Sequence, residues 1–320
     1  MEAFDVVYAQ NATRLQPALF EVCAELDLPV CQHLHDYAFL CPRTSMFRDG
    51  RNCSSQCFDC KILTFRMRSA CEHVDTVISV SDFLKNKFLK NGIFREADHA
   101  VLHNRTLPAS SVSDAKKGFA AHPLDGPFTF GYLGAVKKEK GIEILIEAFA
   151  SSLDSVDARL LVGGIGEESY VRDLKANLPK KVRENIEFMG HVDRDSVLLQ
   201  SDAVIVPSVW EEPQGRVLIE AAVLGIPVIA SKSGGISEVV REDRIGWLYL
   251  PTDVSELKSL IVRAAQEGKT VWRSKAYERF PGLESYAGTA ESSKYYERLN
   301  AILEETVEKK SAKLTSDSDA

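Results

Sequence analysis

The chain has 320 residues, 45% of them hydrophobic and 27% charged, which is an ordinary composition for a globular protein and enough length for two domains. Of its 39 basic and 46 acidic side chains, 14 of each lie in residues 1–120, so the net charge of −7 belongs to the remainder. No large part of the chain is strongly basic, which argues against a nucleic-acid partner.

The start of the chain has no basic segment followed by an apolar one, and no apolar run reaches about 18 residues. We therefore expect neither a signal peptide nor a transmembrane helix. The expected location is the cytoplasm, with peripheral contact at the inner face of the membrane left open.

Short apolar runs alternate with helical patterns through the first hundred residues. The patterns predict strands over residues 4–10, 28–35, 71–81 and 99–104 and helices over 15–26 and 82–92. In the second helix, Asp82 is expected to cap the start and Gly92 to end it. Its apolar residues beside three lysines suit a membrane surface, but packing against the sheet is the favoured interpretation.

Residues 106–127 break this alternation because they are rich in Pro, Ser, Ala and Gly. A second series then predicts strands over 128–134, 158–164, 186–192, 203–208, 227–231 and 245–251, with helices between them and a longer helix over 254–268. The predicted organisation is a first domain (1–110), a linker (111–127), a second domain (128–280), a helix crossing back to the first domain (281–308) and a disordered tail (309–320).

Alternating strands and helices indicate parallel sheets covered by helices on both faces. The predicted fold is therefore α/β, with two Rossmann-like doubly wound domains facing a cleft. Ligands of such sheets bind beyond the carboxyl ends of the strands, so the cleft is the expected site.

All seven cysteines lie within the first 71 residues, and their odd number without an export signal argues against a disulfide framework. The spacing Cys57-x-x-Cys60 is typical of metal ligands, and Cys41 and Cys53 would complete a four-thiolate set for structural zinc or an iron–sulfur cluster. Reduced thiols in a partly buried loop are the favoured alternative.

Two glutamates, Glu212 and Glu220, flank the start of the helix predicted over 215–225. Gly215 lets the backbone approach a ligand. The N–H groups that follow, at Arg216, Val217 and Leu218, would form an anion site suited to a diphosphate. From there Glu220 would bind the hydroxyls of a ribose and Glu212 those of the group that the diphosphate carries. The ligand implied is a nucleotide-sugar, and the alternative is two solvated surface glutamates.

The segment WEEPQGRVLIEAAVLGIPVIASKSGGISEVV, residues 210–240, resembles the donor-site signature of glycosyltransferase family 4, whose members are retaining enzymes of the GT-B fold. The likeness spans nearly the whole chain. GYLGAVKKEKGIEILIEAF resembles the family's glycine-rich turn, with Gly134, and its Lys-Gly pair. IEFMGHV, with Gly190, resembles the segment whose backbone reads the nucleobase. LHDYAFLCP and ISVSDFL resemble segments of the first domain.

This resemblance implies transfer of a sugar from a nucleotide-sugar to a glycan, lipid-linked or small-molecule acceptor. Lys140 would neutralise the diphosphate, Glu212 would contact the donor sugar and Glu220 the ribose. His35 would lie near the reacting centre from the acceptor side. The resemblance also implies front-face transfer in which the leaving diphosphate helps to take the acceptor's proton. No cofactor is expected. No catalytic cation is expected either, because none of the resembling segments contains an Asp-x-Asp pair.

Two features depart from the family pattern. Ala135 occupies the position where the family usually has an arginine, and Lys137 or Lys138 would have to supply that charge. The chain also begins at a strand midway through the family's first domain, so roughly 60 to 90 residues of an α/β domain are expected to be missing, and a partner chain would complete the truncated sheet. The alternative function is therefore a non-catalytic nucleotide-sugar-binding remnant or one subunit of a split transferase. An epimerase or phosphorylase of the same fold is the weakest alternative.

Overall fold

The structure, a computed structural model, describes residues 4–10, 15–104, 124–242, 244–279 and 291–318. The chain forms two compact units: unit 1 comprises Met1–Arg105 with Ser293–Ala320, and unit 2 comprises Thr106–Ser292. Most of the predicted linker and the first ten residues of the predicted last helix lie outside the described residues.

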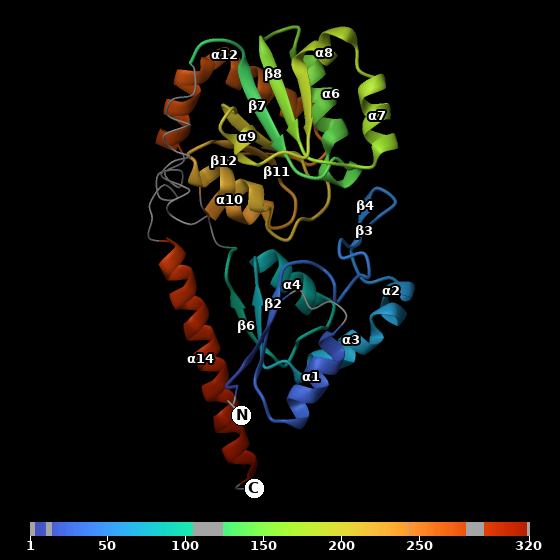
Figure 1. Ribbon diagram of the computed structural model, residues 1–320, viewed down its shortest axis with the longest axis vertical. Helices are drawn as coiled ribbons and strands as arrows, with labels where there is room; N and C mark the ends of the chain where they lie inside the picture. The colour runs from blue at the N-terminus through green and yellow to red at the C-terminus, as the bar shows by residue number, and fades with distance from the viewer. Residues whose placement is uncertain (1–3, 11–14, 105–123, 243, 280–290, 319–320) are drawn as a thin grey trace. The chain divides into compact units, whose positions relative to one another are not determined.

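Unit 1 is built on a parallel sheet of four strands in the order β1-β2-β5-β6 (Figure 1). The central strands β2 and β5 are buried along their whole length, as expected for a parallel sheet covered on both faces. A separate antiparallel hairpin, β3 with β4, follows β2. The elements are β1 (Val7–Ala9), α1 (Gln16–Glu25), β2 (Val30–Leu34), β3 (Phe47–Arg48), β4 (Arg51–Asn52), α2 (Phe58–Leu63), α3 (Phe65–Ala70), the 3-10 turn η1 (Cys71–His73), β5 (Thr76–Ser79), α4 (Asp82–Lys90), β6 (Asp98–Val101) and α14 (Glu291–Ser318).

Helix α4 confirms the predicted element but corrects its cap. The side chain of Ser81, not Asp82, accepts a hydrogen bond from the N–H of Leu84, because Ser81 has the extended backbone that an N-cap requires. Leu84 and Phe88 are fully buried. These apolar positions therefore pack within unit 1, as favoured, and are not available to a membrane surface.

Helix α14 belongs to unit 1 and corrects the prediction of a disordered tail. Its Leu299 and Ile302 pack against Cys31 and Ile78 of the sheet. The helix continues through Lys309 to Ser318. Two lysines hold its second half: Lys309 lies 2.8 Å from Asp98, and Lys310 lies 3.0 Å from Asp75.

Unit 2 contains a parallel sheet of six strands in the order β12-β11-β10-β7-β8-β9, the doubly wound arrangement that was predicted (Figure 1). Its elements are β7 (Phe128–Leu133), the 3-10 turn η2 (Lys138–Lys140), α6 (Ile142–Ser152), β8 (Ala158–Gly163), α7 (Glu168–Ala176), α8 (Lys180–Asn185), β9 (Ile186–Gly190), α9 (Asp195–Leu198), β10 (Ala203–Val206), α10 (Arg216–Val223), β11 (Val228–Ser231), α11 (Ile236–Glu242), β12 (Gly246–Tyr249) and α12 (Val254–Arg279).

Helix α12 extends beyond its predicted end at Gly268, where the backbone breaks from helical geometry with φ of 74° and then resumes the helix. Trp272, in the extension, is fully buried and stacks on Trp247 with ring centroids 4.0 Å apart. Burial of this large aromatic surface outweighs the local preference of glycine to end a helix.

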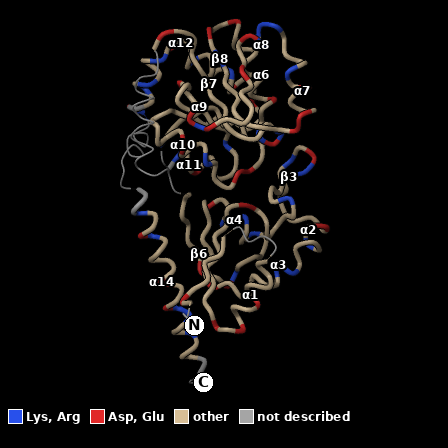
Figure 2. The backbone as a smooth tube through the Cα atoms, viewed as in Figure 1, with Lys and Arg blue, Asp and Glu red and all other residues tan. Residues whose placement is uncertain are grey.

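Lys and Arg alternate with Asp and Glu along both units (Figure 2). This distribution agrees with the argument against a nucleic-acid partner. Within the parts of the chain that the structure describes, no helix is both long enough and apolar enough to cross a membrane.

Candidate active site

The candidate site lies at the carboxyl edge of the unit 2 sheet, where the strand order reverses. The chain runs outward from β7 through β8 to β9, and then returns to the other side of β7 to form β10. Loops that follow neighbouring strands diverge at such a switch point and leave room for a ligand. The loop after β7 leads to Lys140, and the loop after β10 carries Glu212.

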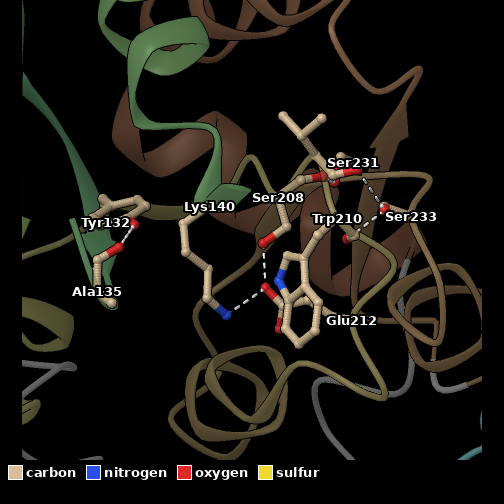
Figure 3. A network of polar contacts seen from close by, with 9 residues as sticks. Tyr132, Ala135, Lys140, Ser208, Trp210, Glu212, Ser231 and Ser233 are labelled. Carbon is tan, nitrogen blue, oxygen red and sulfur yellow. Dashed lines mark hydrogen bonds and ion pairs between the residues drawn. The ribbon is translucent and has the colours of Figure 1, made fainter. Parts of the chain in front are cut away.

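The side chains of Lys140 and Glu212 meet at this switch point (Figure 3). Lys140 Nζ lies 2.9 Å from Glu212 Oε1, and their side chains are 27% and 10% exposed. The same carboxylate oxygen accepts a hydrogen bond from the Ser208 hydroxyl. Lys140 Nζ also lies 5.0 Å from the centre of the Trp210 ring, within range of a cation–π contact. The carboxylate is thus nearly buried and is balanced by one cation and one hydroxyl.

Main-chain contacts hold the two loops together behind these side chains. The carbonyl oxygen of Glu139 accepts hydrogen bonds from the N–H groups of Val209 (3.0 Å) and Trp210 (3.2 Å). Gly141 has φ of 74°, and a Cβ added there would lie 1.8 Å from the Pro207 carbonyl oxygen. Only glycine permits this approach, which brings the Lys-Gly pair against the loop after β10.

The loop after β11 fixes the backbone of Glu212. The N–H of Gly235 donates to the Glu212 carbonyl oxygen at 2.8 Å, and a Cβ on Gly234 would lie only 2.3 Å from the same oxygen. The hydroxyl of Ser233 donates to the Trp210 carbonyl oxygen at 2.6 Å, and that of Ser231 to Ser208 at 2.6 Å (Figure 3). Three loops therefore fix the position of one carboxylate.

Helix α10 begins beside Glu212, with Gly215 in the left-handed conformation at its N-cap. The N–H of Leu218 already donates to the Gly215 carbonyl oxygen at 3.1 Å, and its side chain is buried. Of the three N–H groups predicted to bind an anion, those of Arg216 and Val217 therefore remain candidates. Arg216 lies 3.6 Å from Glu220, with side chains 77% and 17% exposed, so Glu220 has a local ion-pair partner.

The other predicted glycines connect the neighbouring loops of the same edge. The N–H of Gly134 donates to the Gly163 carbonyl oxygen at 3.0 Å, and the N–H of Gly164 donates to that of Gly190 at 2.7 Å. The loops after β7, β8 and β9 are consequently linked in sequence. Gly190 ends β9 with φ of 69°.

The region around Ala135 supplies little positive charge from side chains close to it. The Tyr132 hydroxyl donates to the Ala135 carbonyl oxygen at 2.7 Å, and burial, followed by the charge of Glu212, raises the pKa of Tyr132. Lys138 lies 3.8 Å from Glu143 in a largely exposed ion pair, and Lys137 is exposed.

His35 belongs to unit 1, unlike the other predicted site residues, and follows β2 in a cluster of polar side chains. Its ring centroid lies 4.2 Å from that of His33, and the Tyr8 hydroxyl hydrogen-bonds to His33 Nδ1 at 2.6 Å. Burial, followed by the charge of His35, lowers the pKa of His33 to about 3. Burial also raises the pKa of Asp36, although its carboxylate accepts a hydrogen bond from the N–H of Ala38.

Two observations concern metals. All seven cysteines are free thiols, and among the described residues no group of three or more His, Cys, Asp or Glu side chains forms a ready metal-binding arrangement. An Asp-x-Asp pair, Asp193-Arg194-Asp195, does occur outside the segments that resemble the family, so paired aspartates are not missing from the chain. Asp193 accepts a hydrogen bond from the N–H of Asp195, whose carboxylate lies 2.9 Å from Arg194 Nε. Metal-independent transfer stays a prediction.

Sequence reasoning missed Ser208, Trp210 and Tyr132 as members of this network. Ser208 follows the buried strand β10 closely, a position from which a side chain reaches the carboxyl edge of the sheet. That signal was available from the sequence. The contact of Trp210 with Lys140 had no such signal because the two lie on loops distant in sequence.

Residues 114–279, just over half of the chain, match the family model of glycosyl transferases group 1. An uncharacterized 42.6 kDa protein from the cps region of Klebsiella pneumoniae is 21% identical over 80% of this chain and 64% of that protein. An uncharacterized glycosyltransferase of Methanocaldococcus jannaschii is 36% identical over 37% of this chain and 31% of that protein. The chain thus spans less than two thirds of the length of either relative.

The crystal structure of Anabaena HepE in complex with UDP superimposes with a TM-score of 0.66 at 23% identity, over 93% of this chain and 79% of that one. At this identity the likeness establishes the fold, which is that of the GT-B glycosyltransferases. Together with the match over unit 2, it shows that the chain belongs to the glycosyl transferases group 1 family.

Proposed function

We propose that this chain is a retaining glycosyltransferase whose unit 2 binds a nucleotide-sugar at the carboxyl edge of its sheet. The observation that carries this proposal is the contact of Lys140 with Glu212, 2.9 Å apart, beside the start of α10. A cation, a nearly buried carboxylate and a helix N-terminus at one switch point suit a ligand with both a diphosphate and hydroxyl groups.

The ligand-free contact between Lys140 and Glu212 suggests how the donor is received. The diphosphate would take Lys140 as its counter-ion, with the N–H groups of Arg216 and Val217 as further donors. Glu212, released from the lysine, would accept hydrogen bonds from hydroxyls of the sugar. Glu220, on the second turn of α10, would accept those of the ribose in place of its contact with Arg216. Gly134 and Gly190 would let the backbone approach the phosphates and the base.

In the proposed step, the bond between the anomeric carbon and the diphosphate oxygen breaks, and a bond forms from the acceptor oxygen to the same face of that carbon. The acceptor's proton passes to an oxygen of the leaving diphosphate. Lys140 and the start of α10 stabilise the negative charge that develops on this group. His35 is proposed to act from the acceptor side, a role that rests on the family resemblance. The acceptor proposed is a glycan or a lipid-linked or small molecule.

The first test is a thermal-shift panel of UDP-, GDP- and ADP-sugars. HepE was crystallised with UDP and with UDP-glucose, so these two ligands are tried first. The best ligand is then compared on Glu220→Ala and on Glu147→Ala, a matched change at an exposed position of α6. Loss of a hydrogen-bonded ribose contact costs about 1–3 kcal/mol. Equal affinity of the two variants would remove Glu220 from the ribose site.

Turnover separates the proposal from its alternative, a nucleotide-sugar-binding remnant or a subunit that requires a partner chain. A transferase releases free nucleotide and forms a product with the anomeric configuration of the donor, which NMR of the product determines. Tight donor binding without any transfer, restored by a longer chain or a second polypeptide, would favour the alternative.

A further inference from the structure

The segment from Cys41 to Leu63 has very little hydrophobic core. Helix α2 contains no buried residue, and its Phe58, Ile62 and Leu63 are 75%, 59% and 70% exposed. The strands of the β3–β4 hairpin are exposed or half-buried. Such a segment needs another source of order, and in small protein units that source is commonly a disulfide or a metal ion.

The backbone of this segment is also strained. Thr44, Met46 and Asp49 have φ of 58°, 48° and 50°, a left-handed conformation that is unfavourable for residues with a Cβ. Residues stay in this conformation when the surrounding structure imposes it. The short antiparallel pairing of Phe47 with Asn52 supplies few contacts for that purpose.

Four cysteines converge on this segment. The N–H of Cys53 donates to the Met46 carbonyl oxygen at 2.7 Å and closes the hairpin. Gln56, buried beside Cys57, donates from Nε2 to the Leu40 carbonyl oxygen at 2.8 Å, which brings the start of α2 to Cys41. Cys57 is the N-cap of α2, and Cys60 lies within its first turn.

The thiols interact with one another. Burial, followed by hydrogen bonds and charge contacts with Cys57 and Cys41, raises the pKa of Cys60 to about 12. Burial and then the neighbouring thiols of Cys41 and Cys57 raise the pKa of Cys53. Each of the four is therefore close to at least two of the others.

We propose that Cys41, Cys53, Cys57 and Cys60 form a structural zinc site. Four thiolates at about 2.3 Å from a tetrahedral zinc ion lie about 3.8 Å from one another, which is close to the separation of thiols in hydrogen-bond contact. The described side chains do not yet form a closed coordination shell. Rotation of the cysteine side chains would close it without refolding of the backbone.

The charge balance supports this assignment. Binding exchanges four thiol protons for one Zn²⁺ and leaves a net charge of about −2 on the site, since each ligand must be deprotonated. Arg43 and Lys87 act on Cys53, and Arg48 acts on Cys57, each in the direction that favours the thiolate. These cations offset the charge of a zinc tetrathiolate.

The site would hold the loop that follows His35. The N–H of Cys41 donates to the Tyr37 carbonyl oxygen at 2.7 Å, and the N–H of Tyr37 donates to that of Thr44 at 3.2 Å. A fixed Cys41 thereby fixes the turn at residues 37–44. The inferred role is structural, and it does not depend on the transfer reaction proposed above.

The test is elemental analysis of the full chain, purified without chelator after expression with added zinc. We expect about one zinc per chain, lost in Cys57→Ser and in Cys60→Ser. Cys71→Ser is the matched control, because Cys71 is a buried thiol that donates to the Met67 carbonyl oxygen at 3.0 Å and lies outside the cluster. It should keep its zinc.

If the cluster variants fail to fold, the wild-type chain still decides the question. After chelation under reducing conditions, titration with Co²⁺ should produce the strong visible and near-ultraviolet bands of a tetrahedral thiolate site, and Zn²⁺ should abolish them. Iron with inorganic sulfide would replace zinc by an iron–sulfur cluster. A mass lower by two hydrogens per cysteine pair would show a disulfide, and metal-free protein that gives no cobalt bands would reject the site altogether.

Discussion

Lys140 Nζ lies 2.9 Å from Oε1 of Glu212, 72 positions further along the chain, and this ion pair joins the loops after β7 and β10. The cation proposed for the diphosphate is thus neutralised by the carboxylate proposed for the sugar. A donor must exchange this contact for its own, and a ligand with both groups can satisfy both side chains at once. A nucleotide without the sugar leaves Glu212 to compete for Lys140.

Replacement of Lys140 by methionine should lower the rate of transfer at saturating donor about 100-fold or more, because a preorganised cation near the leaving group is lost. The rate constant is measured as released nucleotide. Lys138→Met is the matched control, since Lys138 is an exposed lysine of the same turn that pairs with Glu143. Similar losses in the two variants would count against a specific role for Lys140.

Gly141→Ala should destabilise unit 2 by more than about 3 kcal/mol, because the added methyl group would overlap the Pro207 carbonyl and the backbone is left-handed. All three tryptophans of the chain, Trp210, Trp247 and Trp272, lie in unit 2, so fluorescence in urea follows its unfolding. Gly126→Ala is the control, with φ of 84° and no atom within 4 Å of the added Cβ. A small loss in both variants would show that the two loops separate easily.

Asp202→Asn should cost unit 2 about 3–5 kcal/mol. Asp202 is fully buried, accepts a hydrogen bond from the Thr129 N–H, and lies 2.7 Å from Arg273 and 3.4 Å from Lys269. The amide would leave two partly buried cations without their counter-ion. Asp154→Asn, in an exposed pair with Lys181, should change the urea midpoint little. Equal midpoints for the two variants would contradict the structural role of Asp202.

Unit 1 should lose stability as the pH falls below about 6.5, because His33 is buried in its neutral form. Its folded-state pKa, about 3, lies below that of the unfolded chain, so the contribution is complete above pH 6.5 and declines towards pH 3. The slope is at most about 1.4 kcal/mol per pH unit.

Urea unfolding followed by circular dichroism at pH 6.5 and 5.5 measures this loss, with tryptophan fluorescence reporting unit 2 separately. His33→Asn, which keeps an acceptor for the Tyr8 hydroxyl, should lose about 1 kcal/mol less than the wild type over this interval. Neighbouring groups such as Asp36 titrate in both proteins and cancel in the comparison. An imidazole signal that titrates near pH 6.5 would refute the shift.

The sequence determined the fold class and much of the site. Fully apolar runs alternating with helical patterns sufficed for two parallel sheets, because strands buried on both faces must be apolar throughout. Glu212, Gly215 and the start of α10 could be located because strand, loop and helix follow one another directly in the chain. The Lys-Gly pair at 140–141 was recognised in the same way, from adjacent residues.

Only the tertiary structure decided which of these local features meet. The contact of Lys140 with Glu212 and the approach of Gly141 to Pro207 depend on β7 and β10 being neighbours, and two strands separated by two others along the chain carry no local mark of their pairing. Long-range contacts also overrode local signals: Trp272 carries α12 past Gly268, and Asp75 and Asp98 hold α14 beyond Lys309. In each case, burial or charge pairing between distant residues outweighs the conformational preference of the residues at the boundary.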